Sequence, residues 1–125
     1  MARGILTGIR IIDLTQALAG PYCTQLLADF GAEVVKIERP GSGDQSRGWG
    51  PPFIKDESAY FLGTNRNKRS LAIDLSKNEA RPILQRLLKG SDILIHNVPK
   101  HSSRVRLGID AESCMRINPA LIWAS

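Results

Sequence analysis

The stretch of residues 9–40, IRIIDLTQALAGPYCTQLLADFGAEVVKIERP, constrains the fold of this chain more than any other segment. Residues 9–14 are a short apolar run, long enough for a buried strand and too short for a helix. A helix is expected to begin at Gly20, because the proline that follows suits a first helical turn, and to end at Gly31. Residues 32–37 predict a second strand. Strand, helix and strand in about thirty residues form a βαβ unit with parallel strands and a right-handed crossover.

The turn of residues 15–21, between the first strand and the helix, is a candidate anion site. It brings the N–H groups of a helix N-terminus to the carboxyl edge of a sheet, where the unpaired amides and the helix dipole favour negative charge. A dinucleotide fingerprint has three glycines at fixed offsets, whereas this turn has only Gly20, which argues against a nicotinamide cofactor. Glu38 lies near the expected place of a ribose-binding acid, but an acid at that spacing also arises by chance. A βαβ unit without any ligand remains an alternative.

The rest of the chain continues the alternation of strands and helices. The expected elements are strands over residues 70–75, 92–95 and 121–124 and helices over residues 57–63, 76–89 and 111–117. A capping box from Ser76 to Glu79 starts the second of these helices, Pro82 predicts a kink or a late first turn in it, and Asp110 caps the third. Residues 41–53 are too rich in glycine and proline for regular structure and predict a loop.

This alternation predicts an α/β fold with a Rossmann-like open, mostly parallel sheet and helices on both faces. Ligands of such sheets bind at the carboxyl ends of the strands. We therefore expect the segments that follow strands, residues 15–21, 38–53 and 96–106, to face one crevice.

The net charge of +5 allows a nucleic acid, a membrane surface or a polyanionic small ligand as partner. Aromatic residues make up only 6% of the chain and do not alternate with basic ones, and there is no helix-turn-helix or zinc pattern. No apolar run reaches the length of a membrane span. We therefore expect a phosphorylated small molecule as ligand, with no nucleic acid and no membrane. Cys23 and Cys114 are expected to be buried thiols in a reducing compartment.

The sequence provides no obvious nucleophile with its base. His96 and His101 have no partner at useful spacing, so we expect structural or exposed roles for them. Asp13, at the end of the first strand, is expected to accept a backbone N–H near Thr15 as in an Asx turn. The basic residues 65–69, just before a predicted strand, suit phosphate contacts, although such a cluster is most often a solvated turn.

Four segments resemble a known family. They are residues 13–53, 65–71 (NRNKRSL), 92–97 (DILIHN) and 118–125 (NPALIWAS), and they occur in family order across nearly the whole chain. This pattern resembles the N-terminal portion of the class III coenzyme A transferases, which include formyl-CoA transferase, carnitine-CoA transferases and α-methylacyl-CoA racemase. The resemblance implies that residues 1–125 are the CoA-binding part of a larger domain. Its ligand would be CoA or acyl-CoA as a substrate, with no prosthetic group and no metal.

In the full-length family, an aspartate attacks the acyl-CoA thioester to form a mixed anhydride, and CoA passes between small carboxylic acids. The racemases of the same fold use a histidine and an aspartate. These catalytic residues lie downstream of the matched region, so the resemblance implies no catalytic residue in this chain. Family members are interlocked dimers, which leaves a homodimer open here. The expected location is the cytoplasm, with the mitochondrial matrix or the peroxisome as alternatives in a eukaryotic cell.

The resemblance and the basic cluster together imply a set of CoA contacts. The expected contacts are Leu18, Ala19, Arg39, Lys68, Arg69, Ile73, Asn97, Val98 and Arg106. Val98 departs from the family pattern, which has an aromatic residue after the asparagine. Two other functions stay open at this point: a non-catalytic nucleotide-binding or interaction domain, and an NADP-dependent oxidoreductase domain.

Overall fold

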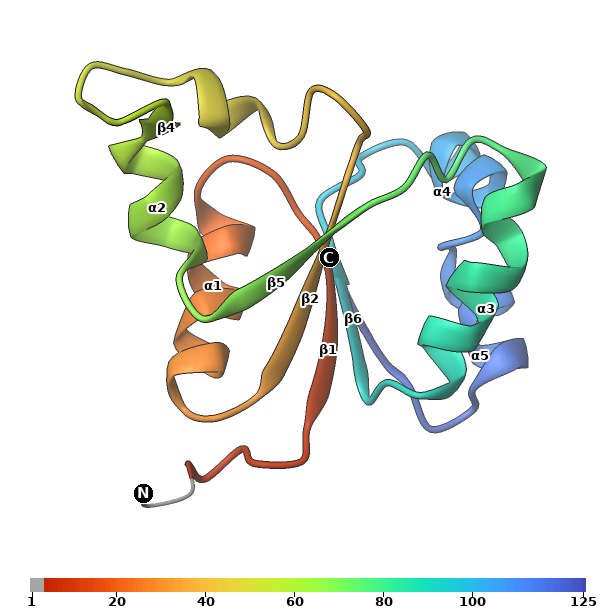
Figure 1. Cartoon of the computed structure of the whole chain (residues 1–125). Coiled ribbons are helices and arrows are strands. Elements are labelled where there is room, and N and C mark those ends of the chain that lie inside the picture. Colours follow the sequence, from red (N-terminus) through yellow and green to blue (C-terminus); the bar gives the residue numbers. More distant parts are fainter. Residues whose placement is uncertain (1–3) are drawn as a thin grey trace.

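The computed structural model describes residues 4–125 as an open sheet with helices on both faces (Figure 1). Five parallel strands lie in the order β5-β2-β1-β6-β7. Their bounds are Arg10–Leu14 for β1, Glu33–Glu38 for β2, Lys68–Ala72 for β5, Ile93–His96 for β6 and Ile122–Ala124 for β7. The predicted Rossmann-like α/β fold is confirmed. The strand order reverses between β1 and β6, which makes that place the topological switch point.

The helices cover the two faces unequally (Figure 1). On one face lie α1 (Ala19–Asp29) and α2 (Ala59–Asn65), and on the other lie α3 (Arg81–Lys89), α4 (His101–Leu107) and α5 (Ala111–Ile117). Neighbouring residues of β1 serve opposite faces, since Ile11 packs in the α1 cluster and Ile12 in the α3 cluster. This double burial explains why two apolar residues follow each other in β1 without alternation. Among residues 4–125, no helix combines the length and apolar character that crossing a bilayer requires.

Helix α1 forms where the sequence predicts it, and Gly31 closes it with a positive φ of 103°. Only part of its apolar residues face inward: Leu27 packs against the cluster that contains Ile11, whereas Tyr22 and Phe30 are 49% and 52% exposed. Small and polar side chains form the rest of the face toward the sheet. The hydroxyl of Thr24, for example, donates to the buried carboxylate of Asp13 at 2.6 Å.

The prediction of a capping box at residue 76 is wrong. The hydroxyl of Ser76 donates to Asp74 at 2.6 Å, a 3-10 turn (Asn78–Ala80) follows, and α3 begins only at Arg81. Pro82 lies in the first turn of α3, as the predicted late first turn requires. The predicted cap of α5 is confirmed, because the carboxylate of Asp110 accepts the N–H of Ser113 at 3.0 Å.

Two features were not predicted. Helix α4 has no fully buried residue. Its sequence therefore lacks the regular spacing of apolar residues by which a helix is predicted. The loop after β2 contains a 3-10 helix (Gln45–Gly48), and the segment that follows forms a hairpin of β3 (Phe53–Ile54) and β4 (Glu57–Ser58).

The two cysteines are free. Cys114 is buried as expected, whereas the expectation of a buried Cys23 is wrong, because Cys23 lies on the outer side of α1.

Candidate functional site

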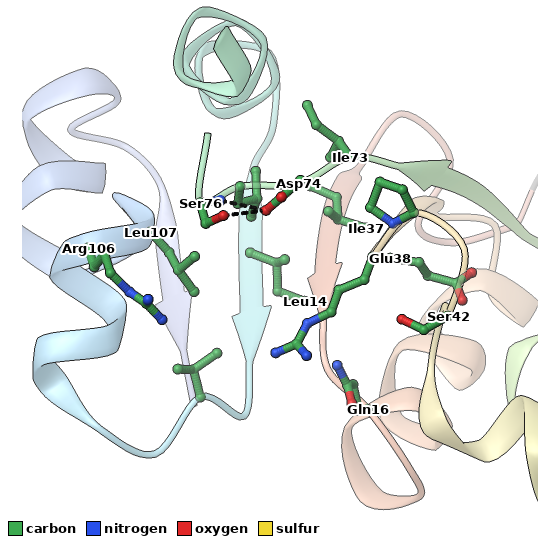
Figure 2. Close-up of a pocket in the computed structure, with 14 residues that line it drawn as sticks. Leu14, Gln16, Ile37, Glu38, Ser42, Ile73, Asp74, Ser76, Arg106 and Leu107 are labelled. Atoms are coloured by element: carbon green, nitrogen blue, oxygen red, sulfur yellow. Dashed lines mark hydrogen bonds between the residues drawn. The ribbon is translucent and has the colours of Figure 1, made fainter. Parts of the chain in front are cut away.

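A pocket of about 500 Å³ opens at the carboxyl ends of β1, β2, β5 and β6, around the topological switch point (Figure 2). This volume and this place in the sheet are typical of small-molecule sites in open α/β folds. The lining residues are Leu14, Gln16, Ile37, Glu38, Arg39, Pro40, Ser42, Ile73, Asp74, Leu75, Ser76, Val98, Arg106 and Leu107. Nearly all of them follow a strand directly or end one.

The pocket combines apolar walls with two cationic groups. Arg39 follows β2, while Arg106 belongs to α4, and Figure 2 shows Arg106 across the pocket from Ser42. Within residues 4–125, neither guanidinium takes part in an ion pair. Leu14 and Leu107 add apolar surface to the same pocket (Figure 2). Such a pocket suits a ligand that carries negative charge on an apolar frame.

Two acids line the pocket, Glu38 and Asp74. Asp74 accepts the hydroxyl of Ser76 at 2.6 Å and its N–H at 3.0 Å, and these two bonds lower the pKa of its carboxyl. Asp74 is therefore ionised at neutral pH, and one of its oxygens is already engaged.

Glu38 holds the loop that forms one wall of the pocket. Its carboxylate accepts Nε of Arg47 at 2.7 Å, Oγ of Ser70 at 2.7 Å and the N–H of Asp44 at 2.8 Å. Burial alone would raise the pKa of Glu38, but the bonds from Arg47, Ser70 and Asp44 outweigh it and lower the pKa to about 2. Because the carboxylate is occupied in this way, Glu38 is a loop anchor, and the structure does not leave it free for a ribose.

The predicted contacts divide into three groups: those in the pocket lining, those on neighbouring segments outside the lining, and those remote from it. Arg39, Ile73, Val98 and Arg106 line the pocket. The side-chain amide of Asn97 lies beside it and bonds the backbone of Gln16, accepting its N–H at 3.1 Å and donating to its carbonyl at 2.9 Å. Leu18 and Ala19 lie at the start of α1, outside the pocket lining, and Leu18 is half exposed. Their contact with a ligand stays a prediction.

Lys68 and Arg69 form the third group, and the structure places them away from the pocket. The ammonium of Lys68 is buried and bonds Asp13 at 3.0 Å, the carbonyl of Pro21 at 2.7 Å and Asn65 at 2.8 Å, which uses all three of its N–H groups. Arg69 is exposed and pairs with Glu33 at 3.1 Å. The physical reason is that β5 begins at Lys68, two residues earlier than predicted, so these cations lie at the amino end of the strand and not at its carboxyl edge.

Gln16, Ser42, Asp74 and Ser76 line the pocket but were not among the predicted contacts. Their place in the sequence could have identified them, since each lies a few residues after a strand and the ligands of such sheets bind at the carboxyl ends of the strands. Asp74 and Ser76 were not expected in the lining because the preceding strand was predicted to continue to residue 75, whereas β5 ends at Ala72.

The other polar candidates are structural. His96 is buried, its Nδ1 accepts the N–H of Val98 at 3.2 Å, and its ring packs edge-on against Trp123 with centroids 4.7 Å apart. Asp13 accepts the N–H of Thr15 at 2.9 Å, which confirms the predicted Asx-type turn. Trp49 packs edge-on against Tyr60 and does not line the pocket.

Comparison with known proteins bears directly on this pocket. Residues 6–125 match CoA-transferase family III. A succinyl-CoA:glutarate CoA-transferase of Mus musculus is 46% identical over 121 residues, which cover 96% of this chain and 27% of the relative. A formyl-CoA:oxalate CoA-transferase of Afipia carboxidovorans is 42% identical over 120 residues, covering 96% of this chain and 28% of the relative.

A solved structure agrees with these sequence matches. The crystal structure of a CAIB/BAIF family protein from Brucella suis superposes with a TM-score of 0.91 at 40% identity, over 98% of this chain and 33% of that protein. The chain thus spans only 27% to 33% of the length of these relatives. The family match extends over nearly all the described residues, including every residue of the pocket. The chain therefore belongs to CoA-transferase family III.

Proposed function

We propose that this part of the protein binds the CoA moiety of an acyl-CoA thioester in the pocket at the switch point. The observation that carries this proposal is a pair of guanidiniums, those of Arg39 and Arg106. They line a pocket with mixed polar and apolar walls and have no ion-pair partner among the described residues. CoA offers phosphates for such cations and an adenine ring and pantetheine arm for the apolar walls.

In the full-length protein, the pocket would hold CoA while one carboxylic acid replaces another on its sulfur. The relatives described above carry this type of transfer in their names, with succinate, glutarate, formate or oxalate as acids. The carboxylates of Asp13, Glu38 and Asp44 are all buried and bonded to donors. The proposal therefore assigns the attacking carboxylate to a part of the protein outside residues 4–125. Free thiols favour a reducing compartment such as the cytoplasm.

Calorimetric titration with CoA and with 3′-dephospho-CoA tests the proposal. A charge-assisted phosphate contact is worth roughly 1.5–3 kcal/mol, so CoA should bind about tenfold or more tightly than the dephosphorylated compound. A short DNA duplex is the control for generic attraction to a basic protein, and its affinity should be lower and should fall steeply with salt. Failure of CoA to bind, or tighter binding of the duplex, would contradict the proposal.

A further inference from the structure

The turn of residues Thr15–Ala17, named here the pocket turn, brings Gln16 into the pocket lining. Its backbone is held almost entirely by side chains. The N–H of Thr15 donates to Asp13 at 2.9 Å, and the carbonyl of Thr15 accepts Nζ of Lys36 at 2.8 Å. Asn97 bonds both the N–H and the carbonyl of Gln16, and the N–H of Ala17 donates to Asp44 at 3.2 Å.

Lys36 and Asp44 form a fully buried ion pair behind this turn. Nζ of Lys36 lies 2.9 Å from Oδ2 of Asp44, and their side chains are 1% and 0% exposed. The second oxygen of Asp44 also accepts the N–H and the hydroxyl of Ser46. The pair therefore joins the pocket turn to the loop after β2, whose residues Arg39 and Ser42 form another part of the pocket wall.

Burying two opposite charges contributes little to stability on balance, because the cost of removing both from water is large. An apolar pair of the same volume would fill the space equally well. The apolar pair could not bond the carbonyl of Thr15 or the N–H of Ala17. Ala17 has a φ of 71°, a left-handed conformation that costs a non-glycine residue free energy and persists only where surrounding bonds impose it.

We propose that Lys36, Asp44 and Asn97 are positioning residues, which hold the pocket turn so that Gln16 faces the ligand. Lys36 and Asp44 act from the side of β2, and Asn97 acts from the end of β6. The effect on ligand affinity rests on the proposed binding of CoA, whereas the effect on the turn itself can be measured without any ligand.

The test uses two variants and a matched control. Asn97→Ala removes both bonds to Gln16 from an exposed position, so this variant will fold. Lys36→Met together with Asp44→Leu removes the buried pair without leaving one charge unpaired, and it also removes the acceptor of the Ala17 N–H. The control is Arg66→Met with Asp29→Leu, which removes an ion pair of 2.6 Å between residues that do not line the pocket.

Three quantities are measured for each variant: the melting temperature, amide proton exchange at Gln16 and Ala17 without ligand, and the Kd for CoA. Asn97→Ala should speed exchange at Gln16, and the Lys36/Asp44 variant should speed exchange at Ala17. Both should weaken CoA binding by about three- to tenfold, the effect of one ordinary hydrogen bond. The control should change neither exchange at the turn nor affinity.

Unchanged exchange at Gln16 in Asn97→Ala would overturn the proposal, and a fall in CoA affinity with unchanged exchange would assign Asn97 to direct ligand contact instead. If the unmodified protein does not bind CoA, the proposed function fails. The exchange rates alone then show whether Lys36, Asp44 and Asn97 hold the pocket turn in place. If the Lys36/Asp44 variant does not fold, the exchange rate at Gln16 in Asn97→Ala tests whether side chains hold the pocket turn.

Discussion

Charged side chains occupy part of the space between the sheet and the helices α1 and α2, beside the apolar cluster that contains Ile11. Asp13, Lys36, Glu38 and Lys68 all point to this face and are nearly inaccessible to solvent. Each has an oppositely charged partner within 3.0 Å. Removing one member of such a pair leaves the other charge buried and uncompensated, and that is far more costly than losing an exposed pair.

Lys68→Met is expected to lower the free energy of unfolding by about 3 kcal/mol, since it leaves the carboxylate of Asp13 buried without its cation. The loss should lie at the low end of the usual range, because Thr15 and Thr24 still donate to Asp13. Arg69→Met, at the next residue, removes only an exposed pair and should cost less than about 1 kcal/mol. Urea denaturation measures both variants. Equal losses would contradict the buried network.

Arg39→Ala should weaken CoA binding by about tenfold or more, because it removes a charge-assisted phosphate contact in the pocket. Arg69→Ala is the matched control: it removes the same side chain from the basic cluster, at a position outside the pocket lining. Calorimetry with CoA should find its affinity unchanged. A similar loss in both variants would indicate non-specific attraction by net charge.

His96 should make the protein sensitive to pH in the weakly acidic range. Burial, with Arg104 acting in the same direction, lowers the pKa of His96 below its ordinary value of 6.5. The unfolded chain therefore takes up a proton at a higher pH than the native state, so stability falls as pH drops below about 6.5, by at most about 1.4 kcal/mol per pH unit. His96→Asn keeps an acceptor for the N–H of Val98 but does not titrate. Urea denaturation between pH 5 and 8 should show a smaller slope in this variant, and an equal slope would refute the assignment.

At the scale of elements, hydrophobic pattern predicts those helices and strands that are buried on a continuous face. Residues 9–14 and 32–37 coincide with β1 and β2 within one residue, because both are buried on two sides. Helix α4 has no buried face, and its only strong signal is Gly108, which ends it with a φ of 73°. The start of β5 was misplaced because Lys68 looks like a turn residue, although its side chain is buried among acceptors that are remote in sequence.

Helix α5 depends on its cap, since a helix of seven residues has few internal hydrogen bonds. Asp110→Ala removes the bond to the N–H of Ser113 and should lower the free energy of unfolding by about 0.5–2 kcal/mol. Glu112→Ala, in the same helix, removes only an exposed pair with Arg116 and should cost no more than about 0.5 kcal/mol. Thermal denaturation followed by circular dichroism distinguishes the two variants. A greater effect of Glu112→Ala would contradict the capping role.

Across the whole molecule, the sheet topology decides where the ligand pocket lies, and the sequence predicts the open, mostly parallel sheet but not its strand order. The carboxyl ends of β1, β2, β5 and β6 meet at one edge, which brings together residues as distant in sequence as Gln16 and Arg106. Of the CoA contacts that the resemblance implies, Arg39, Ile73, Val98 and Arg106 line the pocket at this edge, and their contact with CoA stays a prediction. The sequence could not show that the polar groups of Lys68 and Asn97 form hydrogen bonds within the protein, because their partners lie in distant segments.

The chain of 125 residues is expected to bind CoA without transferring it. The resemblance to the family implies that transfer requires a carboxylate placed to attack a thioester, and both carboxylates that line the pocket already accept hydrogen bonds. Glu38 accepts bonds from Arg47, Ser70 and the backbone, and one oxygen of Asp74 is held by Ser76. Incubation with an acyl-CoA and a free carboxylic acid, at any pH, should therefore give no exchange and no acyl or CoA adduct in the mass spectrum. A full-length member of the family serves as the positive control. An adduct on Glu38 or Asp74 would show that this part of the protein carries the nucleophile itself.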